Sequence, residues 1–181
     1  MRQLGTFTSA FAAGTLLLTA GLTACANTDA APHPSPDDVI KAATLHLTDV
    51  CLTRRGLTPP VPGRGKPSAD DQERIADALF GAGRTELSVR LPTGYVVRAH
   101  TDGCLATAQQ RLYGDQRRWF RSSAIVNNLG PEAAHTHSTL AEVRARHRAE
   151  LADWRRLRAH ALKSAKTVLA TATAIDPSPN Q

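Results

Sequence analysis

An apolar run stops abruptly at a cysteine near the start of the chain, and this border constrains the fold more than any other feature. Arg2 precedes the run "SAFAAGTLLLTAGLTA" (9–24), and polar residues follow Cys25 at once. The run is shorter than the ~20 apolar residues that a helix needs to span a bilayer. A charged start, an apolar middle and small residues before a cut are typical of an export signal. We therefore expect residues 1–24 to be a signal peptide, and only the remainder to fold.

The residues around the expected cut have a more specific pattern. Leu22-Thr23-Ala24-Cys25 resembles the lipobox of bacterial lipoprotein precursors. The resemblance implies that the Cys25 thiol receives diacylglycerol, with acyl chains such as palmitate, and that the chain is cut just before it. Two acyl chains hold a protein on a membrane where one does not. We expect a protein anchored by lipid to the extracytoplasmic face of the cell membrane. A plain secretory signal with a chance cysteine and a retained membrane helix are the alternatives.

Two cysteines remain once Cys25 carries lipid. Cys51 and Cys104 are an even set in an exported domain, where disulfides form and persist. A bridge that closes a loop of about 50 residues would stabilise the fold by about 4 kcal/mol in the chain-entropy model. We predict a disulfide between Cys51 and Cys104. Two free thiols, one of them catalytic, are the alternative.

Composition divides the rest of the chain. Residues 25–36 contain three prolines and nothing large and apolar to bury, which predicts a flexible tether. A helical domain is expected over 37–170, and a disordered tail over 171–181.

Capping residues and apolar spacing predict the elements of that domain. Ser35 and Pro36 favour a helix start, and Ser68 and Thr139 begin two further capping patterns. Alternating apolar residues around "PTG" predict a hairpin, and an apolar repeat of seven predicts a long helix with a weak point at Gly114. The expected fold class is mainly α, a small helical domain with a long antiparallel helical hairpin and a minor β-hairpin. The expected helices cover 36–55, 68–81, 102–129 and 139 to about 168, and the β-hairpin covers 85–99.

Basic side chains concentrate in the last predicted helix. Between 138 and 166 the sequence has eight basic and three acidic residues. Outside the cell the available polyanions are lipid headgroups and wall polymers, so nucleic acid is not an expected partner. These basic side chains suit contact with an anionic surface. The alternatives are that they form a solvated face without a role, or that they contact a protein. The residues predicted to make an anionic-surface contact are Arg144, Arg148, Arg155, Arg158 and Lys163.

No sequence motif predicts catalysis, a metal or a cofactor. The G-x-S-x-G, H-E-x-x-H and S-x-x-K signatures and a phosphate-binding glycine loop are missing from the sequence. His135, His137 and His147 lack the further ligands that zinc needs. We expect a non-enzymatic interaction or binding module whose partner is an envelope protein or an anionic wall polymer. A ligand-binding lipoprotein with a pocket beside Trp119 and Trp154 is the second hypothesis, and an extracellular enzyme the third. The tryptophans also suit a simple core role, because both lie on apolar repeats.

The contexts of the two cysteines carry a further resemblance. The segments "VCLTRRGL" (50–57) and "TDGCLATAQQRLYG" (101–114) are similar to the cysteine-containing helices of small, uncharacterised actinobacterial lipoproteins. The segment "RAELADWRRLRA" (148–159) is similar to the charged closing helix of that family. The resemblance implies an anchored helical domain bridged by the same two cysteines, and it implies no activity.

Overall fold

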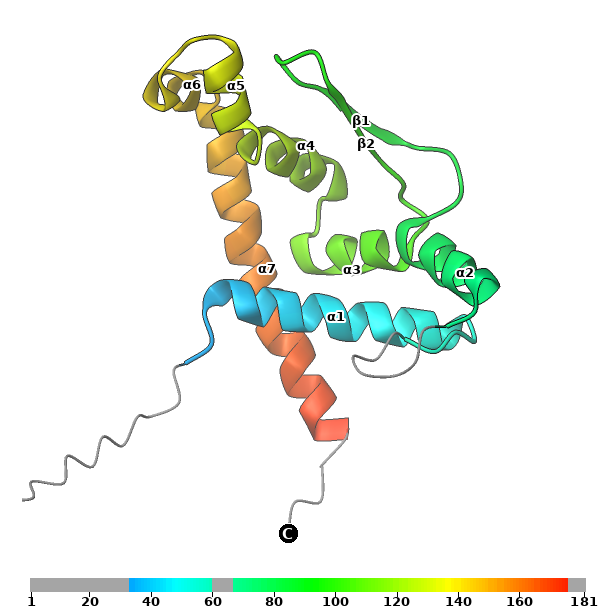
Figure 1. Cartoon of the computed structure of the whole chain (residues 1–181). Helices are drawn as coiled ribbons and strands as arrows, with labels where there is room; N and C mark the ends of the chain where they lie inside the picture. Colours follow the sequence, from blue (N-terminus) through cyan, green and yellow to red (C-terminus); the bar gives the residue numbers. More distant parts are fainter. Residues whose placement is uncertain (1–32, 60–66, 176–181) are drawn as a thin grey trace, which may run out of the picture. The chain divides into compact units, whose positions relative to one another are not determined.

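Helices make up most of the computed structural model, which describes residues 33–59 and 67–175. Over these ranges the chain is mainly helical with one small antiparallel sheet (Figure 1), as the sequence predicts. The predicted signal peptide and residues 25–32 of the predicted tether lie outside the described residues. The helices are α1 (Pro36–Arg54), α2 (Ala69–Phe80), α3 (Cys104–Tyr113), α4 (Gln116–Val126), α5 (Leu129–His135), α6 (Leu140–Arg146) and α7 (Arg148–Ile175), and the strands are β1 (Leu87–Arg90) and β2 (Val96–Ala99).

Side-chain caps fix three of the predicted helix starts. The Ser35 hydroxyl accepts a hydrogen bond from the Asp38 backbone N–H at 3.2 Å, and the Asp38 carboxylate accepts one from the Ser35 backbone N–H at 3.1 Å. The Asp38 carboxylate also accepts a hydrogen bond from the Ser35 hydroxyl at 2.6 Å, and this bond, followed by the one from the Ser35 backbone N–H, holds the pKa of Asp38 below its usual value. Thr139 and Glu142 make the same reciprocal pair before α6. Ser68 caps α2. Local capping chemistry thus places α1, α2 and α6 where the sequence predicts them.

The predicted single helix over 102–129 is wrong, because the chain breaks twice within that range. The first helix, α3, ends at Gly114, whose φ of +78° suits glycine and costs other residues energy. Asp115 then caps α4 by accepting a hydrogen bond from the Arg118 backbone N–H at 3.0 Å. A second break follows at Asn127, before α5. A glycine stop followed at once by an acidic cap outweighs the apolar repeat that runs across it.

The antiparallel arrangement predicted for the long helices is nevertheless present between α4 and α7. Arg118 pairs with Asp153 at 2.8 Å, and Arg121 pairs with Glu150 at 3.4 Å. Partner numbers fall as chain numbers rise, so the two helices run in opposite directions.

The last predicted helix is also divided, and it extends further than expected. A change of backbone conformation at His147 (φ −101°, ψ 32°) separates α6 from α7. Helix α7 then continues through Ile175, so the first residues of the predicted tail (171–181) are helical. Residues 176–181 lie outside the described ranges.

The main core lies where α1 crosses α7 and α3 packs against both (Figure 1). The Tyr113 ring stacks on Trp119, with ring centroids 3.6 Å apart and planes 12° from parallel. Half-buried Trp119 therefore extends the core, as one interpretation of the sequence predicts. The buried members of this core are Ile40, Ala43, Leu112, Tyr113, Leu157, Ala161 and Ala165.

The predicted β-hairpin is confirmed and covers α4. Leu87 pairs with Ala99 and Val89 with Val97 in antiparallel register. The side of β1 that carries Leu87 and Val89 is buried, because the sheet packs on α4 and supplies a second core with Ile125. The candidate site lies away from this sheet, between α1, α3 and α7.

Candidate functional site: a cationic groove between three helices

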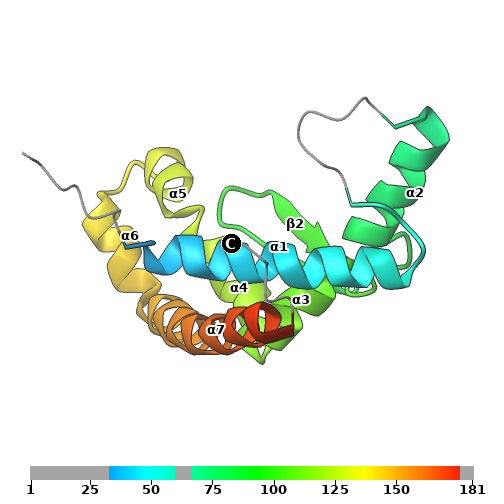
Figure 2. The ribbon, with the colours of Figure 1, turned by 90° about the horizontal axis from the view of Figure 1, so that it is seen from below.

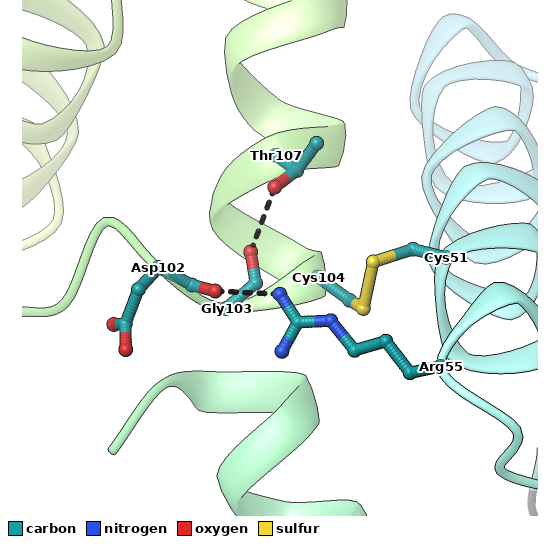
Figure 3. Close-up of a disulfide and its surroundings, with 6 residues drawn as sticks. All are labelled: Cys51, Arg55, Asp102, Gly103, Cys104 and Thr107. Carbon is teal, nitrogen blue, oxygen red and sulfur yellow. Dashed lines mark hydrogen bonds between the residues drawn. A yellow bond between two sulfur atoms is a disulfide. The ribbon is translucent and has the colours of Figure 1, made fainter. Parts of the chain in front are cut away.

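A disulfide joins the last turn of α1 to the first residue of α3 (Figure 3). Cys51 and Cys104 are bonded, with Cα atoms 5.6 Å apart, which confirms the predicted pair. Cys104 is fully buried in a small core with Leu52. The Arg55 guanidinium donates a hydrogen bond to the backbone carbonyl of Asp102 at 2.8 Å. One covalent bond and one hydrogen bond therefore fix the corner at which α1 meets α3.

The end of α2 packs tightly against this corner. A Cβ atom on Gly103 would lie 2.6 Å from the Leu79 carbonyl oxygen, so only glycine allows the two backbones to approach this closely. The Asp102 carboxylate accepts a hydrogen bond from the Gly83 backbone N–H at 2.9 Å, and this bond holds the pKa of Asp102 below its usual value. The close approach makes the corner a rigid support for whatever lies beside it.

A groove of about 820 Å³ opens between α1, α3 and α7. Its volume lies within the roughly 300–1,000 Å³ typical of small-molecule sites. Figure 2 shows the C-terminal half of α7 next to α1 and α3, which agrees with their packing. The bridged Cys51 belongs to the groove wall. The lining residues are His46, Leu47, Val50, Cys51, Arg54, Thr107, Ala108, Arg111, His160, Lys163, Ser164, Thr167, Val168, Thr171 and Ala172.

The groove has an apolar floor and a cationic rim. The rim consists of Arg54 on α1, Arg111 on α3 and Lys163 on α7, all three exposed to solvent. No carboxylate occurs among the described residues that line the groove. Within residues 33–59 and 67–175, no salt bridge joins any of the three cations to an acidic side chain. The floor is formed by buried or half-buried apolar side chains, namely Leu47, Val50, Ala108, Val168 and Ala172.

The five basic residues singled out in the sequence do not share one environment. Lys163 lines the groove. Arg158 pairs with Asp37 at the start of α1, and its guanidinium carbon lies 4.6 Å from the centroid of the Trp154 ring. Arg158 therefore links α7 to the start of α1 through an ion pair, and its charge is not free to contact an anionic surface. The remaining three, Arg144, Arg148 and Arg155, are exposed on α6 and α7.

Sequence reasoning missed two of the groove cations, Arg54 and Arg111. Each sits near the end of its own helix, where a basic residue is ordinary because it suits the negative helix terminus. Only the crossing of α1, α3 and α7 brings them to one groove with Lys163.

The pocket predicted beside the two tryptophans is not the groove, because neither tryptophan lines it. Trp119 is stacked on Tyr113 and Trp154 is covered by Arg158. A smaller cavity of about 220 Å³ lies between α4 and α7, but salt-bridged Arg118, Arg121, Glu150 and Asp153 occupy its walls.

A buried carboxylate that no sequence pattern singles out lies at the junction of α5, α6 and α7. The Glu132 side chain is 4% exposed and pairs with Arg146 at 3.2 Å and with His147 Nε2 at 2.8 Å. His147 Nδ1 lies 3.8 Å from Glu150. His147 is thus a satisfied, half-buried histidine between α6 and α7, and the cluster closes the bend between these helices.

Three general findings complete the description of the site. Among the described residues, no group of three or more His, Cys, Asp or Glu side chains is placed to hold a metal ion. Within the same ranges, every helix is too short or too polar to cross a bilayer. Comparisons with family models, curated proteins and solved structures give no significant match to this chain. A function must therefore be argued from the groove and the sequence.

Proposed function

We propose that this protein is a lipid-anchored, extracytoplasmic binding protein that holds a small ligand in the groove between α1, α3 and α7. The observation that carries the proposal is the groove itself, with its volume of about 820 Å³, its apolar floor and a cationic rim that has no salt bridge within the described residues. Concave sites with a mainly apolar lining and a few polar groups are typical of ligand binding.

The sequence around Cys25 supports the anchor. Its lipobox-like residues imply lipid on the first residue of the mature chain. The eleven residues from Cys25 to Ser35 have the composition of a tether, and a flexible chain of that length spans about 18 Å. The Cys51–Cys104 bond supports an oxidising compartment. The proposal thus puts the groove close to the outer surface of the membrane.

The chemistry of the lining favours binding over catalysis. Ser164 and His160 both line the groove. In the described part of the chain no hydrogen bond joins the Ser164 hydroxyl to a histidine. An activated nucleophile needs such a contact with its base. The lining therefore lacks the arrangement that a hydrolase would use, and we assign no catalytic residue.

Metabolic labelling with an acyl precursor tests the anchor. Wild-type protein should incorporate the label, and the Cys25→Ala variant should not. Equal labelling of the two proteins would remove the anchor from the proposal.

A neutral, environment-sensitive dye such as Nile red tests the groove in the unlipidated mature chain. We expect dye fluorescence to rise on binding and Ala172→Asp to abolish the rise, because this change puts a carboxylate into the apolar floor. Ala170→Asp is the matched control, since Ala170 is exposed on the same helix and lies outside the lining. Absence of dye binding, or equal loss in both variants, would contradict a binding groove.

Exposed Arg144, Arg148 and Arg155 favour a second candidate function, a contact with an anionic wall polymer. Retention of the unlipidated mature chain on such a polymer should fall with salt. It should also fall when the three arginines are changed to glutamine. Retention that ignores both salt and these substitutions would exclude this contact.

A further inference from the structure

The electrostatic imbalance of the groove points to the charge of its ligand. Some arginines of the described surface face carboxylates, as Arg118 faces Asp153 and Arg121 faces Glu150. Others, such as Arg144, have no salt bridge within the described ranges. The rim cations Arg54, Arg111 and Lys163 face one groove without an acid in its described lining. Like charges around one cavity repel one another, and an anion bound between them relieves that repulsion. The groove is therefore complementary to an anion.

The hydroxyl groups of the lining indicate an apolar body for that anion. Thr107, Thr167 and Thr171 each donate their hydroxyl proton to the backbone carbonyl four residues earlier, at 3.1, 3.3 and 2.9 Å. These protons are already used within the helices and are not available to a ligand. A sugar or another polyhydroxyl ligand would find no free donor at these three threonines, whereas a hydrocarbon chain lying along them needs none.

The shape of the lining indicates an extended ligand. Helix α7 lines the groove from His160 to Ala172, a distance of about 18 Å at 1.5 Å per residue. Apolar side chains from all three helices lie along this length. An extended hydrocarbon chain could therefore lie against α7 with its anionic end at the cationic rim.

The headgroup is better matched by a carboxylate than by a phosphate. In the described part of the chain the groove is lined by the later turns of α1 and α7 and the middle of α3, and by no helix N-terminus. Phosphate sites typically use free backbone N–H groups at helix N-termini. Here only side chains can hold the headgroup, and the guanidinium forks of Arg54 and Arg111 can pair with a carboxylate without help from backbone N–H groups.

We infer that the groove binds a single-chain fatty acid, with its chain on the apolar floor and its carboxylate at Arg54, Arg111 and Lys163. This inference rests on the proposed function and specifies its ligand. A lipid-anchored protein would meet such molecules at the membrane surface.

Binding of saturated fatty acids to the unlipidated mature chain tests this inference. Dodecanoate should displace the neutral dye, and dodecanol should do so at least about tenfold more weakly, because it lacks the charge. From octanoate to dodecanoate, affinity should rise by about two- to fourfold per added methylene. Acetate should show no displacement.

Two triple variants locate the headgroup. Arg54→Gln/Arg111→Gln/Lys163→Gln should weaken dodecanoate binding by about tenfold or more, and should weaken binding of the neutral dye less. All three residues are exposed and free of salt bridges in the described ranges, so the variant should fold. The matched control, Arg144→Gln/Arg148→Gln/Arg155→Gln, removes the same charge outside the groove and should bind dodecanoate as wild type does.

The outcomes separate failure of this inference from failure of the proposed function. Suppose that the dye binds and Ala172→Asp blocks it, but dodecanoate binds no better than dodecanol. This result would support a binding groove and overturn the inference that its ligand is a fatty acid. Preference for dodecyl phosphate over dodecanoate would also overturn it. If only the control variant lost dodecanoate binding, the carboxylate would bind outside the groove and the inference would be wrong. If neither dye nor fatty acid binds, the proposed function fails with the inference.

Discussion

Removal of the Cys51–Cys104 bond should cost this domain a large part of its stability. The bond links residues 53 positions apart, and a loop of that length corresponds to about 4 kcal/mol in the chain-entropy model. Cys104 is fully buried, so Cys51→Ala/Cys104→Ala also removes some buried sulfur volume. For a domain of roughly 150 residues, about 4 kcal/mol corresponds to a fall in Tm of about 8–16 °C.

Urea unfolding followed by circular dichroism measures this cost. We would compare the oxidised mature chain, the same chain with reductant, and the double alanine variant with and without reductant. Reductant should lower the midpoint of the wild type and leave the variant unchanged. If the thiols of the reduced wild type are shown to be free but its urea midpoint has not changed, the loop-closure reasoning is refuted. So would a loss of less than about 1 kcal/mol in the variant.

Three further predictions concern packing and titration. Gly103→Ala should destabilise the fold by about 1–3 kcal/mol, because its Cβ would meet the backbone at the end of α2. The control Gly130→Ala lies in open space within α5 and should stabilise the fold by about 0.5–1 kcal/mol. Equal effects of the two changes in urea unfolding would contradict the close approach. His147→Ala leaves one oxygen of buried Glu132, the one that contacts His147, without its hydrogen-bond partner and should cost about 1–3 kcal/mol, with His147→Gln costing less. An alanine variant as stable as wild type would argue against the cluster. Burial raises the pKa of Tyr113 to about 12, so its contribution to stability is full below pH 10 and falls as the pH rises toward 12. Tyr113→Phe should remove this loss of stability at alkaline pH. If the urea midpoints of the wild type and the variant change equally between pH 10 and 12, the prediction is wrong.

Local rules predicted the starts of helices well, because each depends on a few neighbouring residues. Ser35 with Asp38 and Thr139 with Glu142 make the caps that their spacing predicts. The hairpin followed from alternation on either side of "PTG". At Gly114 the sequence predicts only a weak point, because the apolar repeat continues across it. The glycine and the Asp115 cap that follows nevertheless end one helix and start the next.

The groove could not be predicted from the sequence, because no short segment contains it. Arg54 and Arg111 are unremarkable residues near helix ends until α1 and α3 are joined at one corner. The buried Glu132 lies in a short helix whose partners, Arg146 and His147, come more than ten residues later. In each case the relevant contact depends on how helices cross, and a pattern of apolar spacing does not specify a crossing.

The position of Cys51 has a consequence for ligand affinity as well as for folding. The same residue closes the bridge to α3 and forms part of the groove wall, so one wall is held in place before any ligand arrives. Pre-ordering of a site lowers the conformational entropy that binding must remove. A reduced protein kept folded at low temperature should therefore bind its ligand more weakly, although no residue that contacts the ligand has been exchanged.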